Sequence, residues 1–156
     1  MDLRTRLLHL GLRRGLDPES QAPRPRGRGV PIDELIPGEW HDASGGRCFV
    51  AKQRFALTYH HGRHRLAEVL SVPSEVWSLA LNDASGDAFD VRRAAFVDIE
   101  TSGLSRTGGT VAFLVGLGAL EGDEFVLRQF FMPDYGEEPA LLELVGDTLA
   151  AARDLV

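Results

Sequence analysis

Two carboxylates, Asp98 and Glu100, interrupt an apolar stretch within residues 94–104. The flanking Val97 and Ile99 favour a β-strand. Side chains two residues apart on a strand point to the same face, so we expect both carboxylates on one face and Val97 and Ile99 on the other. Two like charges at the end of a buried strand are costly unless a positive group lies between them. A divalent cation is the simplest such group, because hard cations prefer carboxylate oxygens.

The spacing alone leaves a second interpretation open. Asp-x-Glu is a short pattern, and two solvated carboxylates at the point where a strand ends in a loop would give the same letters. The residues that follow the two acids are therefore needed to choose between a metal site and a solvated strand end.

Residues 98–104 read Asp-Ile-Glu-Thr-Ser-Gly-Leu. This stretch resembles the first motif of the DEDD (DnaQ-like) 3′-to-5′ exonucleases, Asp-x-Glu-Thr-Thr-Gly-Leu, with Ser102 in place of the second threonine. Residues 107–118 and 126–131 extend the likeness to the YprB-like branch of ribonuclease H-like proteins. The resemblance covers roughly residues 32–156 and is strongest after residue 92.

The resemblance implies a nuclease that hydrolyses phosphodiester bonds of nucleic acid, DNA or RNA, with exonuclease and endonuclease attack both open. In the family, four acidic residues hold two metal ions, Mg²⁺ or Mn²⁺, which activate a water and stabilise the phosphate. On this likeness Asp98 would bridge the two ions and Glu100 would bind one of them. Both residues are thus expected to be catalytic residues and metal ligands.

The same resemblance implies substrate contacts in the turn after the two acids. The Thr101 backbone and Gly103 would approach the sugar and phosphate of the terminal nucleotide, and Leu104 would wedge against a base. Arg106 would meet a phosphate. The sequence leaves two alternatives open: ordinary turn chemistry for Thr101, Gly103 and Leu104, and solvent contact for Arg106.

Half of the family's acidic residues are not found in the 156 residues. The third acid of the family normally follows a later strand, in a segment resembling Asn-Gly-x-x-Phe-Asp. We therefore expect the chain to be truncated, as a fragment or a partial gene product, and inactive alone. The alternative is a non-catalytic remnant of a ribonuclease H-like protein that binds nucleic acid or another protein.

The composition, 44% hydrophobic and 26% charged residues, is typical of a soluble globular protein. Residues 1–30 hold seven arginines against three acidic residues, a charge of +4 that leaves −10 for the remainder of a chain whose net charge is −6. A basic arm can contact nucleic acid, although a solubilising tail would have the same composition. No apolar stretch approaches the ~20 residues of a membrane span, and a single cysteine excludes an intrachain disulfide. These features predict a cytoplasmic protein without membrane contact.

The patterns predict an α/β, ribonuclease H-like but truncated fold in three parts. These are a basic arm and linker (1–30), an irregular α+β accessory segment (31–93) and an incomplete ribonuclease H-like exonuclease domain (94–156). In the last part we expect a three-stranded antiparallel meander at 94–100, 111–120 and 124–132, then one helix at 137–152, and the start of a strand at 154–156. In the accessory segment we expect a strand at 47–55 and a helix at 74–81.

Two further groups of residues have several interpretations. His60 and His64 have the i, i+4 spacing of metal ligands, but Gly62 interrupts any helix between them, so a polar turn is expected instead. Gly116 and Gly118 lie inside a predicted strand, where we expect them to permit close packing or a bulge.

Overall fold

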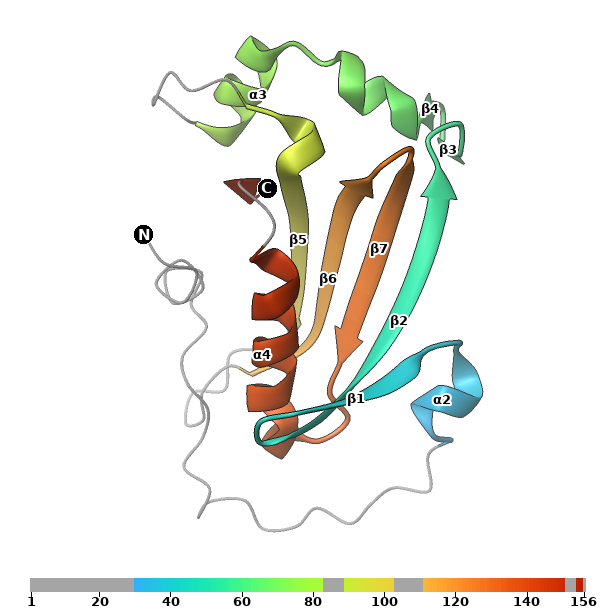
Figure 1. Ribbon diagram of the computed structural model, residues 1–156, viewed down its shortest axis with the longest axis vertical. Coiled ribbons are helices and arrows are strands. Elements are labelled where there is room, and N and C mark those ends of the chain that lie inside the picture. The colour runs from blue at the N-terminus through green and yellow to red at the C-terminus, as the bar shows by residue number, and fades with distance from the viewer. Residues whose placement is uncertain (1–29, 83–88, 103–110, 151–153, 156) are drawn as a thin grey trace.

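The computed structural model describes residues 30–82, 89–102, 111–150 and 154–155 (Figure 1). Its main feature is a six-stranded sheet in the order β1-β2-β7-β6-β5-β8. The strands are β1 (Glu39–Ala43), β2 (Gly46–Ala56), β5 (Ala94–Thr101), β6 (Ala112–Glu121), β7 (Glu124–Phe131) and β8 (Asp154–Leu155). A small hairpin of β3 (His60–His61) and β4 (His64–Arg65) forms a separate two-stranded sheet. The helices are α2 (Ile32–Leu35), α3 (Ser74–Leu81) and α4 (Glu138–Leu149), with 3₁₀ turns η2 (Leu66–Ser71), η3 (Val91–Arg93) and η4 (Tyr135–Glu137).

Strands β5, β6 and β7 form the expected antiparallel meander, and α4 follows it. The β6–β7 turn has Gly122 at φ +63°, a left-handed conformation that favours glycine. After α4 the chain returns to the opposite side of β5, where β8 pairs in parallel with Ala94 and Ala95. The α/β class and the order of these elements agree with the sequence-based expectation.

The segment before residue 94, which was expected to be an accessory segment, supplies two strands of this sheet. Strand β2 pairs antiparallel with β7 from Phe49 to Ala56, and β1 pairs with the other edge of β2. The expected strand at 47–55 and helix at 74–81 are confirmed, while β1 was not predicted. The meander is therefore continued by two strands on the β7 side.

Helix α4 covers one face of the sheet, which we call the helix face (Figure 1). Leu141, Val145 and Leu149 recur every four residues and form the buried stripe of α4. They pack against side chains that alternate along the strands with those of the other face. The core members from the sheet are Cys48, Ala95, Ala112, Val115, Leu117 and Phe130, with Val97 and Ile99 packed against them.

The opposite face, here called the acid face because it holds Asp98 and Glu100, is covered at one end by aromatic rings. Trp77 of α3 packs against Phe89, with 4.9 Å between the ring centroids, and its ring lies 6.4 Å from that of Phe96. The ring of Phe96 in turn lies 6.2 Å from that of Phe125. Gly118 makes this packing possible, since a Cβ there would lie 2.4 Å from Cζ of Phe125. The expectation of close packing at Gly118 is thus confirmed.

At the other end of the acid face, Trp40 packs edge-on against Phe49, with 5.4 Å between the ring centroids. Residues of α2 lie over the same end, where they line a small pocket together with Phe49. Between the two covered ends the side chains of Gln53, Asp98 and Glu100 are exposed. Within the described ranges, no helix is long and apolar enough to cross a membrane.

Candidate metal centre on strand β5

The carboxylates of Asp98 and Glu100 project from the same face of β5. Asp98 lies opposite Gly116 of β6, and Glu100 lies opposite Leu114. The intervening Ile99 packs against the helix-face core, as does Val97. The period of two along a strand therefore places the two acids together on the acid face.

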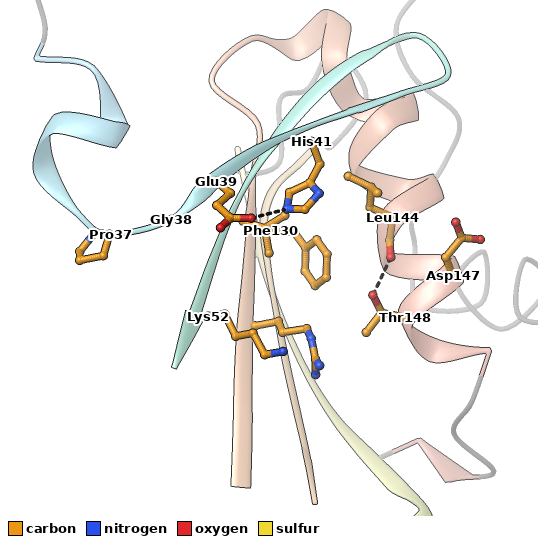
Figure 2. A pocket seen from close by; sticks show the side chains of 11 residues that line it. Pro37, Gly38, Glu39, His41, Lys52, Phe130, Leu144, Asp147 and Thr148 are labelled. Atoms are coloured by element: carbon orange, nitrogen blue, oxygen red, sulfur yellow. Dashed lines mark hydrogen bonds and ion pairs between the residues drawn. The ribbon is translucent and has the colours of Figure 1, made fainter. Parts of the chain in front are cut away.

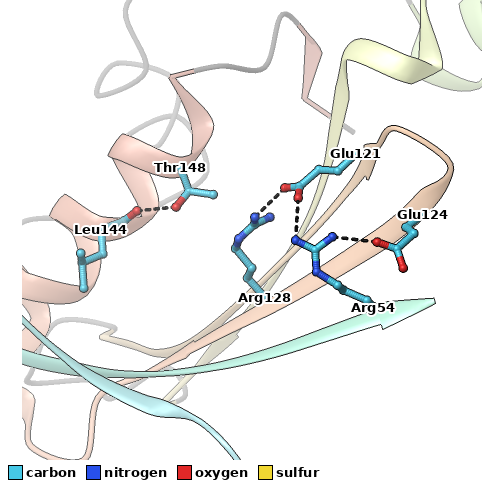
Figure 3. Close-up of polar contacts among 6 residues, drawn as sticks. All are labelled: Arg54, Glu121, Glu124, Arg128, Leu144 and Thr148. Atoms are coloured by element: carbon cyan, nitrogen blue, oxygen red, sulfur yellow. Dashed lines mark hydrogen bonds and ion pairs between the residues drawn. The ribbon is translucent and has the colours of Figure 1, made fainter. Parts of the chain in front are cut away.

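Both acids are exposed and without charged partners in the described part of the chain. Neither side chain makes an ion pair or hydrogen bond with another residue of that part. Arg54 and Arg128 lie on the helix face, where they contact Glu121 and Glu124 beside the β6–β7 turn (Figure 3). No arginine among the described residues neutralises the two carboxylates, so as far as these residues show, their charge is available to a cation.

The strand is irregular immediately after the two acids. The β5–β6 register shifts between Glu100 and Thr101, and Thr101 pairs with Ala112. The Ser102 backbone N–H donates to the Val111 carbonyl at 3.0 Å, which closes the ladder. Thr101 is exposed at this bulge. The other expected substrate contacts, Gly103, Leu104 and Arg106, lie outside the described residues.

On its other side, β5 is paired only near its start, as far as the described residues show. Strand β8 contacts Ala94 and Ala95 and no residue further along. Asp98 and Glu100 therefore lie on a part of β5 whose described hydrogen-bonding partner is β6 alone.

The residues present fit a hydrated divalent cation that is completed by a substrate phosphate. Mg²⁺ is commonly held by one or two carboxylates together with waters and phosphate oxygens. Asp98 and Glu100 supply two such carboxylates. No group of three or more His, Cys, Asp or Glu side chains that could hold a metal occurs among the residues that the structure describes. The site thus offers two of the four acids expected for a complete two-metal centre.

Comparison with known proteins supports this interpretation of the second half of the chain. Residues 95–156 match the family model described as RNase_H superfamily. The chain is also 26% identical over 98 residues to "Uncharacterized protein YprB" of Bacillus subtilis (strain 168). This chain is similar to YprB, and its residues 95–156 are similar to the RNase_H superfamily. The matched stretch is 62% of this chain and 24% of the relative, so the chain spans about a quarter of the length of the curated relative.

The histidines of this YprB-like chain form no metal centre with the other described residues. His61 and His64 face each other in the β3–β4 hairpin, whose turn has Gly62 at φ +62°. His64 Nδ1 lies 2.8 Å from a carboxylate oxygen of Glu68. The Arg65 backbone N–H, and then His64, hold the pKa of Glu68 below its usual value. The polar turn expected here is what the structure shows.

A larger cavity, of about 670 Å³, lies on the helix face of the YprB-like chain, away from the two acids (Figure 2). Lys52 and Arg128 line one side of it, and Asp147 and Thr148 of α4 line another. The Thr148 hydroxyl donates to the Leu144 carbonyl at 2.8 Å. This cavity could not be inferred from the sequence, because its walls come from β1, β2, β7 and α4, which are far apart in the chain.

Proposed function

We propose that this chain carries part of the active site of a metal-dependent nuclease, which hydrolyses phosphodiester bonds of nucleic acid as a 3′-to-5′ exonuclease. The observation that carries the proposal is the placement of Asp98 and Glu100. Both project from the acid face of β5, exposed and without an arginine partner in the described residues. The match of residues 95–156 to the RNase_H superfamily supports the same reaction class.

In this proposal Asp98 is the bridging ligand and Glu100 binds one ion, Mg²⁺ or Mn²⁺. Bound ions would lower the pKa of a water and offset the charge on the phosphate. The two carboxylates project from the same face of β5, so both would meet a phosphate that approaches this face. Thr101 at the bulge, with Gly103, Leu104 and Arg106, is proposed to hold the terminal nucleotide.

Two carboxylates alone are expected to bind a cation weakly and to give no turnover. The described residues hold two of the four acids that the proposed reaction needs. We therefore expect metal binding by the 156-residue chain without measurable cleavage. The division into a basic arm (1–30), an accessory segment (31–93) and an incomplete nuclease domain (94–156) is retained as part of the proposal, with β1 and β2 extending the domain's sheet.

The charge of residues 1–30 favours a second candidate function, binding of nucleic acid without cleavage. Their net charge of +4 contrasts with −10 in the remainder of the chain. Binding through arginines would weaken steeply with salt. Gel shift of a short single-stranded oligonucleotide at two salt concentrations tests this candidate, and unchanged binding after deletion of residues 1–29 would refute it. For the compartment we propose the cytoplasm, since the one cysteine, Cys48, is a free thiol.

Metal titration of the full chain tests the nuclease proposal. Isothermal titration with Mg²⁺ and Mn²⁺ should show binding that falls at least tenfold in Asp98→Asn and Glu100→Gln. Asp123→Asn, in the exposed β6–β7 turn, is the matched control and should bind as the unmodified chain does. In ¹⁵N NMR, Mn²⁺ should broaden the amide signals around residues 98–100 first. An absence of binding, or binding that both site variants retain, would overturn the proposal.

A further inference from the structure

A small pocket lies on the acid face, beside the two acids. Its volume is about 250 Å³, slightly below the ~300–1,000 Å³ of pockets that bind drug-sized ligands. It therefore has room for one small ring system. The lining residues are Ile32, Ile36, Phe49, Ala51, Phe113, Leu114, Gln129 and Phe131. All of them are apolar except Gln129.

The strand register places this pocket in line with Asp98. A row of paired residues runs across the sheet from Asp98 through Gly116 and Gln129 to Ala51. Adjacent strands lie ~5 Å apart, so Gln129 is about 10 Å from Asp98. Gly116 is the residue between Asp98 and Gln129, so no side chain in this row separates the acid from the pocket.

A second row begins at Glu100 and reaches the pocket in one step. Leu114, directly opposite Glu100, is itself a pocket wall, and Phe131 and Phe49 continue the row. The pocket is therefore continuous with the acid pair on the same face of the sheet. A ligand whose charged group lies at the acids would place its next portion over these apolar residues.

The lining chemistry suits a nucleobase. Apolar and aromatic walls accept the flat face of any base, and an amide can donate to and accept from a base edge. The side chain of Gln129 makes no hydrogen bond with another described residue, so its amide is available. It is half-buried, which strengthens its hydrogen bonds relative to an exposed amide.

We propose that this pocket is a base-binding subsite, in which Gln129 reads the edge of one base of a single strand whose phosphate lies at Asp98 and Glu100. The path of the strand rests on the proposed function. Gln129 is then a specificity residue, since its amide contacts the base and takes no part in the reaction at the phosphate. Base preference should accordingly depend on Gln129 and not on the two acids.

Binding of single-base tetranucleotides to the full chain tests this subsite. ¹⁵N NMR titrations with dA₄, dC₄ and dT₄ in the presence of Mg²⁺ should shift the side-chain amide signal of Gln129, and the backbone signals of Ile36 and Phe131. Gln129→Leu keeps the size of the side chain and removes the amide. It should reduce the ratio of affinities between the best and worst base by about threefold or more. Gln53→Leu is the matched control, because Gln53 lies on the same face but outside the pocket, opposite Leu127.

The outcomes separate the subsite from the nuclease proposal. Loss of base preference in Gln129→Leu, with preference kept in Gln53→Leu and in Asp98→Asn, supports the subsite whether or not metal binding is found. The subsite is overturned if the Gln129 side-chain amide signal does not shift at millimolar oligonucleotide. It is also overturned if Gln129→Leu and the unmodified chain have equal base preference. Neither result bears on the nuclease proposal, which the metal titration tests separately. Thermal unfolding of each variant shows whether the fold is intact. If Gln129→Leu does not fold, Gln129→Glu replaces it, and a base preference unchanged in that variant also overturns the proposal.

Discussion

Asp98 lies directly opposite Gly116 where β5 pairs with β6, and a Cβ on Gly116 would lie 3.8 Å from the Cβ of Asp98. This is an ordinary van der Waals distance, so the strand would tolerate a small side chain at residue 116. A larger one would extend over the same face as the carboxylate. The glycine thus leaves open the space into which a cation bound to Asp98 and its waters would fit.

Gly116→Val should weaken metal binding without unfolding the chain. The two methyl groups would occupy the space beside Asp98 that a hydrated cation needs. We expect the affinity for Mn²⁺ to fall about fivefold or more, and that of Gly116→Ala to change much less. Isothermal titration of both variants measures the difference. Equal affinities in Gly116→Val and the unmodified chain would show that the cation does not use this space.

The two glycines of β6 should differ in their effect on stability. A Cβ on Gly118 would lie 2.4 Å from Cζ of Phe125, so the ring would have to move and disturb its contact with Phe96. Gly118→Ala should therefore lower the free energy of unfolding by about 1–3 kcal/mol. Gly116→Ala should be neutral or raise it by up to ~1 kcal/mol, because alanine loses less backbone entropy. Urea denaturation of the two variants measures both values, and equal losses would contradict this account.

The alternation of residues along β5 was enough to predict which face holds the acids. Val97 and Ile99 had to face a core, and this placed Asp98 and Glu100 on the other face without knowledge of the fold. Helix α3 was predicted to the residue, since Pro73 and the apolar pattern after it are local signals. Features that depend on neighbours in the chain were therefore accessible from the sequence.

Features that depend on pairing between distant segments were not accessible. Strand β1 reads Glu-Trp-His-Asp-Ala, which has little strand character, and it forms because β2 offers it an edge. The base-sized pocket likewise brings Ile32 and Ile36 against Phe131, about a hundred residues away. Gln129 could be noticed as a polar residue in a strand, but its row with Asp98 appears only once the register is known.

Glu121 should contribute more to stability than Glu124, although both contact arginines (Figure 3). Glu121 accepts from Arg128 at 2.5 Å and lies 3.6 Å from Arg54, and the Arg128 side chain is only 19% exposed. Glu121→Gln would leave a largely buried guanidinium without its partner, so we expect a loss of about 1 kcal/mol. Glu124→Gln removes only an exposed pair and should cost less than ~0.5 kcal/mol. Urea denaturation at low and high salt measures the free energy of unfolding of both variants. Equal losses in Glu124→Gln and Glu121→Gln would contradict the prediction.

Cys48 should be unreactive in the folded chain at mildly alkaline pH. Its side chain is fully buried, and burial raises the pKa of the thiol from 9.0 to about 11. A hydrogen bond with the Phe131 backbone acts in the opposite direction, and the charge of Glu137 adds to the increase. Because the thiolate is the reactive form, labelling by a thiol reagent at about pH 8 should follow unfolding of the chain. Fast labelling without denaturant would contradict this expectation.

The same raised pKa predicts how stability changes with pH. The thiol ionises at a lower pH in the unfolded chain than in the folded one, so the folded state binds more protons between the two pKa values. The contribution of Cys48 to stability is therefore complete below about pH 9, and it is lost as the pH rises through about 11. Cys48→Ala has no group to ionise, and its free energy of unfolding should fall less between about pH 9 and pH 11 than that of the unmodified chain. Urea denaturation across this range compares the two slopes, and identical slopes would show that Cys48 does not titrate differently in the two states.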